Sequence, residues 1–346
     1  MTPSALGGTC VRDVAGVTHY RAAPIATLET PVPNPPLFSE TSRHLPLPRR
    51  VTTQFRRAAW VDGLSDHPDH AFANKLISYI DYGVPLLYEG PILNQTHPNW
   101  KSCLELRDDV ETSMLYDINK RWKIGPFPQQ PFKYFVGSPM GAFAKPSATA
   151  PGTKKLRVIH DLSWPPGKSV NSFIPEDMCS VSYVTIESAV SIVKRFGPGC
   201  LMAKIDLENA YKQIGVRPSD WYLLGSTWVN SQGQTEFYFD TVLPFGGRSS
   251  AALFNAFADG LEHVMFKNGA SSVIHYLDDI FTAGDPNSTI CQDNMTIMLD
   301  TCENLGVAVN PRKIFGPSTV LEFLGIVIDS DLMELRVSPE RVRVIK

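Results

Sequence analysis

Two adjacent carboxylates stand inside an apolar stretch of the chain. Residues 276–279 read Tyr-Leu-Asp-Asp, with Val-Ile-His immediately before them and Ile-Phe-Thr immediately after them. The flanking residues predict a buried hairpin, and leaving the charges of Asp278 and Asp279 buried without partners would cost several kcal/mol. A divalent cation bound at the tip of the hairpin would compensate both charges. This pair therefore predicts a cation site.

A third carboxylate lies upstream in a matching position. Residues 201–205 (LMAKI) predict a short apolar strand that ends at Asp206. One Asp at the end of a strand and another at a neighbouring hairpin tip can hold two Mg²⁺ ions for in-line phosphoryl transfer, with Mn²⁺ as an alternative ion. Adjacent strand residues point to opposite faces, so Asp278 and Asp279 cannot ligate identically. The alternative is that Asp206 is a cap and the Asp278/Asp279 pair only forms a turn.

Further motifs occur around these carboxylates in a fixed order. In sequence they are LRVIHDLS (156–163), GKSVN (167–171), KIDLENAY (204–211), LPFGG (243–247), YLDD (276–279) and FLG (323–325). Together they resemble the reverse transcriptase core of retroelements, over residues from about 50 to 346. The segments VIHDLS…GKSVN, HYLDD and LEFLGIVIDSDLMELR are most similar to those of the DIRS-type, tyrosine-recombinase retrotransposons.

The resemblance implies a role for each carboxylate and for the residues around the nucleotide. Asp206, Asp278 and Asp279 would be the catalytic, metal-binding set, with Asp278 the more direct ligand. Tyr211 would lie beneath the incoming sugar and exclude a 2′-hydroxyl; the alternative is a buried core tyrosine. The remaining residues would contact the triphosphate (Lys145, Arg157), bind the substrate (Phe245), let the backbone approach the nucleotide (Gly246), protonate the departing pyrophosphate (Lys313) and hold the primer end as a primer grip (Phe323, Leu324, Gly325). The alternatives are a plain turn at Gly246 and an exposed, solvated lysine at Lys313.

The function that follows from this resemblance is RNA-directed DNA polymerase activity. Its partners would be an RNA or DNA template, a nucleic-acid primer and deoxynucleoside triphosphates. Two alternatives stay open: an RNA-dependent polymerase with an RNA product, against which Tyr211 argues, and a catalytically inactive nucleic-acid-binding remnant of a retroelement polyprotein. Exchanging dNTPs for rNTPs distinguishes the first of these.

The order of strands and helices favours an α+β chain with the right-hand fold of polymerases. Residues 1–49 predict a flexible proline-rich arm and residues 50–118 a helical N-terminal extension. Residues 119–330 predict the fingers and a split-βαβ palm. Residues 331–346 would begin a truncated thumb, which is otherwise largely absent. Helical periodicity is clearest near 71–80, 107–122, 185–196, 250–266 and 294–304, strands are expected at 307–309 and 321–328, and hairpins at 222–242 and 272–283.

Composition limits the other classes. No stretch reaches the ~18 apolar residues of a membrane span, the six cysteines are scattered, and no secretory leader is evident, so an intracellular protein is expected. The net charge of −3 is unusual for a nucleic-acid-binding protein. Residues 118–160, however, contain eight lysines and arginines, no acidic residue and interleaved aromatics, which predicts a strand-binding surface.

Overall fold

The computed structural model describes residues 45–146 and 154–337. The α-helices are α1 (Arg57–Gly63), α2 (His70–Tyr82), α3 (Lys101–Glu105), α4 (Arg107–Asn119), α5 (Ile186–Phe196), α6 (Ser250–Lys267) and α7 (Ile290–Leu305). Short 3₁₀ helices are η1 (Asn171–Phe173), η2 (Asp177–Cys179), η3 (Ala210–Gln213), η4 (Pro218–Leu223) and η5 (Pro311–Lys313). The strands are β1 (Gln95–Thr96), β2 (Lys123–Phe127), β3 (Val136–Gly137), β4 (Met140–Pro146), β5 (Lys154–His160), β6 (Leu201–Asp206), β7 (Gly225–Val229), β8 (Thr235–Asp240), β9 (Val273–Tyr276), β10 (Asp279–Gly284), β11 (Phe315–Ser318), β12 (Val320–Phe323), β13 (Ile326–Asp329) and β14 (Glu334–Val337).

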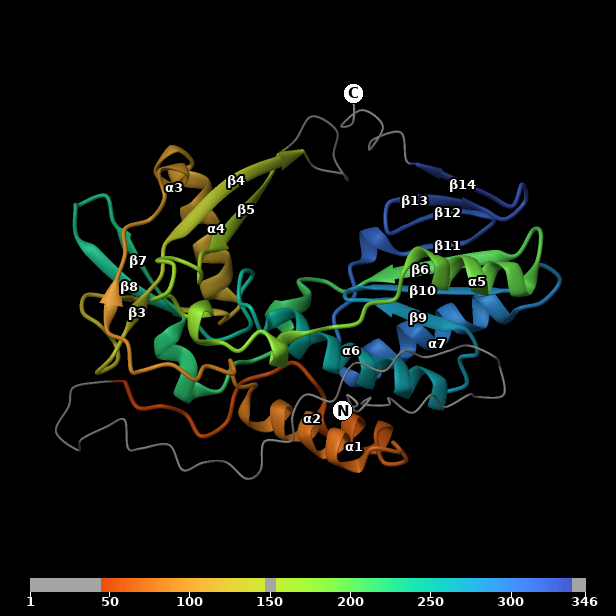
Figure 1. Cartoon of the computed structure of the whole chain (residues 1–346), viewed down its shortest axis with the longest axis horizontal. Coiled ribbons are helices and arrows are strands. Elements are labelled where there is room, and N and C mark those ends of the chain that lie inside the picture. Colours follow the sequence, from red (N-terminus) through yellow and green to blue (C-terminus); the bar gives the residue numbers. More distant parts are fainter. Residues whose placement is uncertain (1–44, 147–153, 338–346) are drawn as a thin grey trace, which may run out of the picture.

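A four-stranded sheet of order β11-β6-β10-β9, here called the central sheet, carries the predicted carboxylates. Helix α5 covers one face, where Phe281 and Met202 are buried beside Ala189 and Val193 of the helix. Helices α6 and α7 cover the other face (Figure 1). Because both faces are covered, the strands are apolar almost throughout, and a charged residue is tolerated mainly at their ends.

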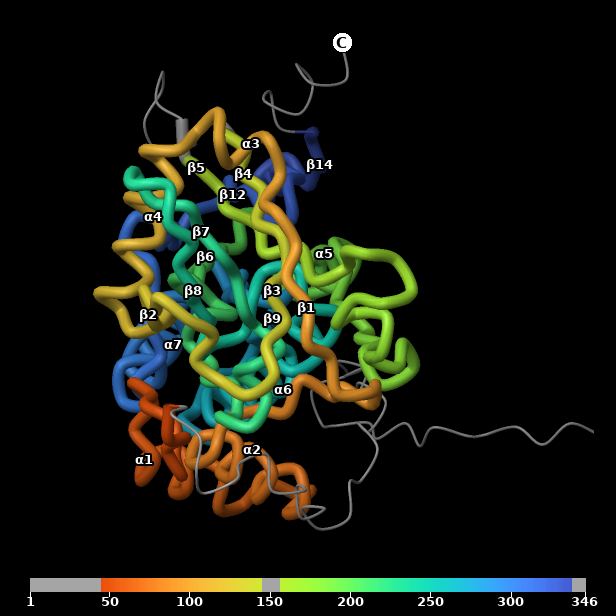
Figure 2. Tube along the Cα trace, turned by 90° about the vertical axis from the view of Figure 1, so that its left-hand side faces the viewer, coloured from red at the N-terminus to blue at the C-terminus, as the bar shows by residue number. Residues whose placement is uncertain are grey.

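A second sheet, of order β1-β3-β7-β8-β2, lies on the other side of the molecule in Figure 1. The chain leaves the central sheet after β6, forms the β7–β8 hairpin in this second sheet, and returns as α6. Strands β4 and β5 form a separate antiparallel ribbon, and β12, β13 and β14 form a three-stranded sheet. Figure 2 shows α1 and α2 at the end of the molecule opposite α3 and β14.

Most of the predicted elements are confirmed. Helices α2, α4, α5, α6 and α7 lie where periodicity placed them, and the hairpins β7–β8 and β9–β10 form. Tyr222, expected at the start of a strand, belongs instead to η4. Within α4 only Val110 and Met114 are buried, and Leu115 is 60% exposed.

Two expected strands were wrong in form. Residues 307–309 make a single bridge between Val309 and Leu207 rather than a strand. Residues 321–328 are two strands, β12 and β13, because Leu324 and Gly325 both adopt positive φ and turn the chain between them. In the segment 331–346, residues 334–337 form β14 and residues 338–346 lie outside the described residues, as does the predicted arm up to residue 44.

No helix within residues 45–146 and 154–337 is both long enough and apolar enough to cross a membrane.

Candidate active site

The three predicted carboxylates all lie at one end of the central sheet. Asp279 is the first residue of β10 and pairs directly with Asp206, the last residue of β6. Asp278 lies in the turn just before β10, and its carbonyl oxygen accepts a hydrogen bond from the Leu207 amide at 2.9 Å. The turn is tight enough to force Leu277 to φ 52°, a conformation that non-glycine residues rarely adopt. The backbone thus fixes the relative positions of Asp206 and Asp278.

The charges of these carboxylates act on one another. Burial raises the pKa of Asp278 to about 6, with Asp206 and Asp279 acting in the same direction and Lys313 against them. Burial also raises the pKa of Asp279, but the neighbouring ammonium of Lys204 lowers it in part. Lys204 and Lys313 therefore offset only part of the burial and mutual repulsion of these carboxylates. Such an excess of negative charge attracts a cation.

Lys313 and Asn310 bring polar groups from the far end of the chain to Asp206. Lys313 Nζ lies 2.6 Å from Asp206 Oδ2, and Asn310 Nδ2 approaches Asp206 Oδ1 at 3.5 Å. The Asn310 amide also donates to the Asp206 carbonyl at 2.8 Å. Asp206 is buried, so these partners offset the cost of removing its carboxylate from water.

The carboxylates fit Mg²⁺ as a partial ligand set. Within the part of the chain that the structure describes, no three His, Cys, Asp or Glu side chains converge closely enough to hold a metal ion by themselves. Mg²⁺, however, is usually held by only one or two carboxylates and keeps waters and substrate phosphates as its other ligands. The electrostatically coupled Asp206 and Asp278 supply that number.

Tyr211 lies beside the carboxylates in an aromatic cluster. Its ring centroid is 5.0 Å from that of Phe245 and 5.5 Å from that of Phe254, which it meets edge-on. Burial, reinforced by Tyr183 and Asp278, raises the pKa of Tyr211 to about 12, so its phenol stays neutral. Phe254 packs edge-on against the ring, while Phe245 is 47% exposed. The cluster presents a rigid aromatic surface next to Asp278.

Gly246 allows two loops to approach each other closely. It has φ +109°, and a Cβ at this position would lie 2.6 Å from the carbonyl oxygen of His160. Only glycine fits such a contact without strain. The loop that follows β8 is therefore seated directly against the end of β5.

Arg157 and Lys145 lie on the β4–β5 ribbon, on different elements from those that carry the carboxylates. Arg157 pairs across the ribbon with Phe143, and its side chain is exposed. The backbone of Lys145 pairs with that of Lys155, but the prediction for the Lys145 side chain lies outside what the structure describes. The triphosphate contacts of both residues stay predictions.

The residues of the predicted primer grip form the turn between β12 and β13. Phe323 is fully buried and packs against Phe281, with ring centroids 5.0 Å apart. Leu324 and Gly325 occupy the turn itself. The Phe323 side chain thus anchors this turn on the central sheet, and contact with a primer would fall to the turn residues.

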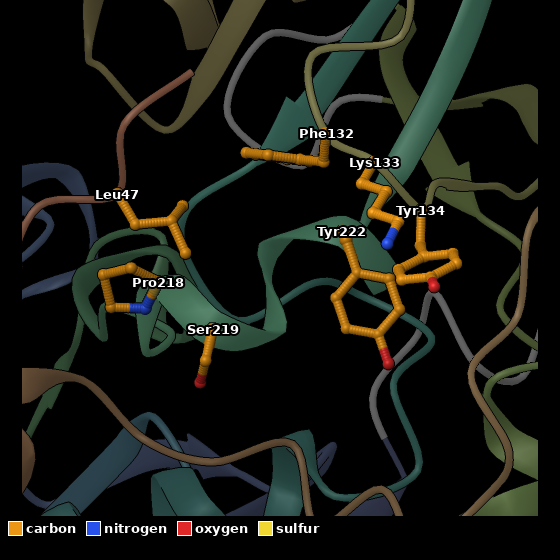
Figure 3. Close-up of a pocket in the computed structure, with 7 residues that line it drawn as sticks. All are labelled: Leu47, Phe132, Lys133, Tyr134, Pro218, Ser219 and Tyr222. Carbon is orange, nitrogen blue, oxygen red and sulfur yellow. The ribbon is translucent and has the colours of Figure 1, made fainter. Parts of the chain in front are cut away.

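The basic segment 118–160 does not form one continuous surface. Lys123 is buried and its Nζ lies 2.6 Å from Asp240 Oδ1, and Phe132 and Phe135 belong to the core. Lys133 and Tyr134 border a small surface hollow together with Leu47, Phe132, Pro218, Ser219 and Tyr222 (Figure 3). None of the predicted site residues lines this hollow.

Several residues of the site were not assigned a role from sequence. Asn310, Tyr183 and Phe254 carry no motif of their own that marks them. Asn171 was part of a motif, and its position in that motif was the available signal. Gln213 is also missed: its amide joins the 208–213 turn to Ala308 through a donor bond of 3.0 Å and an acceptor bond of 2.8 Å.

With this geometry in view, the comparisons with known proteins identify the class. The family model described as reverse transcriptase (RNA-dependent DNA polymerase) matches residues 145–328. The chain belongs to this family, and its matched region contains Asp206, Tyr211, Asp278 and Asp279. No curated protein sequence matches the chain.

Solved structures of foamy viral enzymes share the fold. The foamy viral protease-reverse transcriptase dRH in complex with double-stranded DNA is 16% identical, with a TM-score of 0.56, over 88% of this chain and 50% of that one. The foamy viral protease-reverse transcriptase in complex with an RNA/DNA hybrid is 15% identical, with a TM-score of 0.54, over 87% of this chain and 38% of that one. The CSH mutant of the prototype foamy virus enzyme is 18% identical, with a TM-score of 0.51, over 85% and 36%. The α+β polymerase fold is thereby confirmed, and the chain spans at most half the length of these solved chains.

Proposed function

We propose that this chain is the catalytic core of an RNA-directed DNA polymerase that adds deoxynucleotides to a primer 3′ end. The observation that carries the proposal is the arrangement of Asp206 and Asp278. They are joined through the backbone at one end of the central sheet, with Asp279 beside them and the Tyr211 ring adjacent. The template would be RNA or DNA, as the complexes of the foamy viral enzymes with double-stranded DNA and an RNA/DNA hybrid suggest.

Asp206 and Asp278 would hold Mg²⁺, or Mn²⁺ in its place, with Asp279 adding negative charge behind them. When bound, the metal ions activate the primer 3′-hydroxyl and neutralise charge on the transferring phosphate. The contribution of the chain itself is positioning and electrostatics. The hydrogen bond from the Leu207 amide to the Asp278 carbonyl would keep Asp206 and Asp278 close together before substrate arrives.

The residues around the carboxylates would select and release the substrate. The Tyr211 ring, held by Phe254, would occupy the space that a 2′-hydroxyl needs and so favour deoxynucleotides. Arg157 and Lys145 would bind phosphate oxygens from the β4–β5 ribbon, where a bidentate guanidinium and a compact ammonium are suited to that task. Lys313, whose side chain is 45% exposed, would donate a proton to the departing pyrophosphate.

We infer the kind of genetic element that encodes the chain from the residues of its motifs. The resemblance of residues 158–171, 275–279 and 321–336 to DIRS-type elements favours a retrotransposon origin. A tyrosine-recombinase reading frame in the same genomic element would support this assignment, and an integrase frame in its place would contradict it.

The test is incorporation of dTTP on an oligo(dT)-primed poly(rA) template, with and without Mg²⁺. Asp278→Asn should abolish incorporation, because it removes one ligand charge with little change in shape. Asp300→Asn, at an exposed position on α7, is the matched control and should keep wild-type activity. Primer-template binding without incorporation by the wild type would instead indicate a catalytically inactive nucleic-acid-binding remnant, and incorporation of rNTPs alone would indicate an RNA-synthesising polymerase.

A further inference from the structure

The loop between β8 and α6, residues 244–248, is fastened to the loop after β5 by one buried side chain. Asn171 Nδ2 donates to the Gly246 carbonyl at 2.7 Å and to Ser163 Oγ at 2.9 Å. Its Oδ1 accepts a hydrogen bond from the Arg248 amide at 2.9 Å. The side-chain amide of Asn171 therefore binds the 244–248 loop at Gly246 and at Arg248, across sequence separations of 75 and 77 residues.

Asn171 is itself held firmly. It is only 6% exposed, and its backbone amide donates to the Leu162 carbonyl at 2.9 Å. A buried amide with its donor and acceptor groups paired fixes one geometry, because any rearrangement leaves polar groups unsatisfied. The Asn171 side chain therefore holds the 244–248 loop in one conformation.

Phe245 of the 244–248 loop connects this loop to the candidate active site. Gly246 sits at φ +109°, in contact with the His160 carbonyl, so its peptide has little freedom. The preceding Phe245 packs on the Tyr211 ring, with centroids 5.0 Å apart. Tyr211 in turn lies within electrostatic range of Asp278. A shift of the Gly246 peptide would therefore move the aromatic surface beside the carboxylates.

We propose that Asn171 is a positioning residue for the incoming nucleotide. By holding the Gly246 carbonyl and the Arg248 amide, it fixes Phe245, and through it Tyr211, in the orientation that receives the nucleotide. This inference rests on the polymerase function proposed above. It assigns Asn171 no contact with the reacting atoms.

The test compares two buried asparagines with the same hydrogen-bond pattern. Asn294 is 2% exposed, its Nδ2 donates to Ser272 Oγ and Thr282 Oγ1, and its Oδ1 accepts from the Ser271 amide. Asn171→Asp and Asn294→Asp each keep the acceptor and lose the two donors. Both should lower the melting temperature to a similar degree. Steady-state incorporation then gives kcat and KM for dTTP, and a fluorescence titration gives the Kd for primer-template.

Asn171→Asp is expected to raise KM for dTTP on the order of tenfold, with kcat and the primer-template Kd changed less than about twofold. Asn294→Asp should leave KM unchanged. If both variants show the same KM, Asn171 is only a structural residue and the inference is overturned. If Asn171→Asp does not fold, Asn171→Ser takes its place, because it supplies one hydroxyl but is too short to reach both the Gly246 carbonyl and the Arg248 amide. A wild type that incorporates nothing would overturn the polymerase function itself, which is a different result from equal KM values in an active enzyme.

Discussion

Lys313 Nζ lies 2.6 Å from Asp206 Oδ2, so a lysine side chain bonds one oxygen of a predicted metal ligand. Asp206 is nearly fully buried, whereas the Lys313 side chain is 45% exposed and can move into solvent. The lysine therefore places a positive charge next to Asp206, and Asp206 Oδ2 becomes accessible when the Lys313 side chain moves into solvent.

This relationship predicts how Lys313→Gln affects stability. Without divalent cation the variant should lose about 1 kcal/mol of unfolding free energy, a modest value because the lysine is partly exposed. With Mg²⁺ the difference from wild type should shrink, since the cation then compensates Asp206. Urea unfolding in EDTA and in Mg²⁺ measures both values. An equal loss under both conditions would show that Lys313 and the cation do not act on the same carboxylate.

Tyr211→Ala should weaken selection against ribonucleotides. Removing the ring opens the space beside Asp278 that a 2′-hydroxyl would occupy, so the ratio of kcat/KM for dTTP to that for UTP is expected to fall on the order of 10- to 100-fold. Tyr211→Phe keeps the ring and should keep the ratio. A ratio that falls equally in both variants would assign the effect to the hydroxyl group rather than to steric exclusion.

Gly246→Ala should be more damaging than alanine at another glycine of positive φ. The left-handed backbone costs about 1–2 kcal/mol for any residue with a Cβ, and at Gly246 that Cβ would also lie 2.6 Å from the His160 carbonyl oxygen. Gly233 has φ +78°, and a Cβ added there would meet no atom within 4 Å, so Gly233→Ala is the matched control. Thermal unfolding and incorporation rates should both fall further in Gly246→Ala than in Gly233→Ala.

His275 predicts a pH dependence of stability that is separate from catalysis. Its imidazole is buried on β9, with Nδ1 2.6 Å from Glu262 and Nε2 3.4 Å from Asp259. Burial alone would lower its pKa, but Glu262 and Asp259 outweigh burial and raise the pKa of His275 to about 10, from 6.5. A raised histidine pKa stabilises the fold fully below pH 6.5, and this contribution is lost as the pH rises from 6.5 towards 10.

The measurement is the difference in unfolding free energy between wild type and His275→Gln across that pH range. Subtracting the variant removes the titration of other groups, and the difference should decline steadily above pH 6.5. A constant difference would show that His275 is neutral in the folded protein and that the ion pairs with α6 do not form.

Local sequence predicted the elements that carry the catalytic residues. The apolar runs ending at Asp206 and surrounding Asp278 predict strands because a short continuous apolar run bounded by turn residues is typical of a strand buried on both faces. Helices α5, α6 and α7 follow from their periodic apolar residues in the same way. The order of the motifs around Tyr211 and Gly246 then pointed to the family that the family match confirms.

Errors arose where a local pattern has more than one packing solution. The apolar residues 321–328 predict a strand equally well as one piece or two, and the turn at Leu324 divides them. The basic segment 118–160 predicted a surface, but Lys123 is buried against Asp240. The sequence shows which residues are charged, but it does not show which groups lie next to them in the folded protein.

Sequence alone determined the secondary structure around the carboxylates and the identity of the chemical groups available there. Only the tertiary structure decided which of those groups meet: Lys313 with Asp206 across 107 residues, and Asn171 with Gly246 across 75. The physical reason is range. Backbone propensity and apolar periodicity act over a few residues, whereas a hydrogen bond between distant side chains forms only when the packing of whole helices and sheets brings its atoms within about 3 Å.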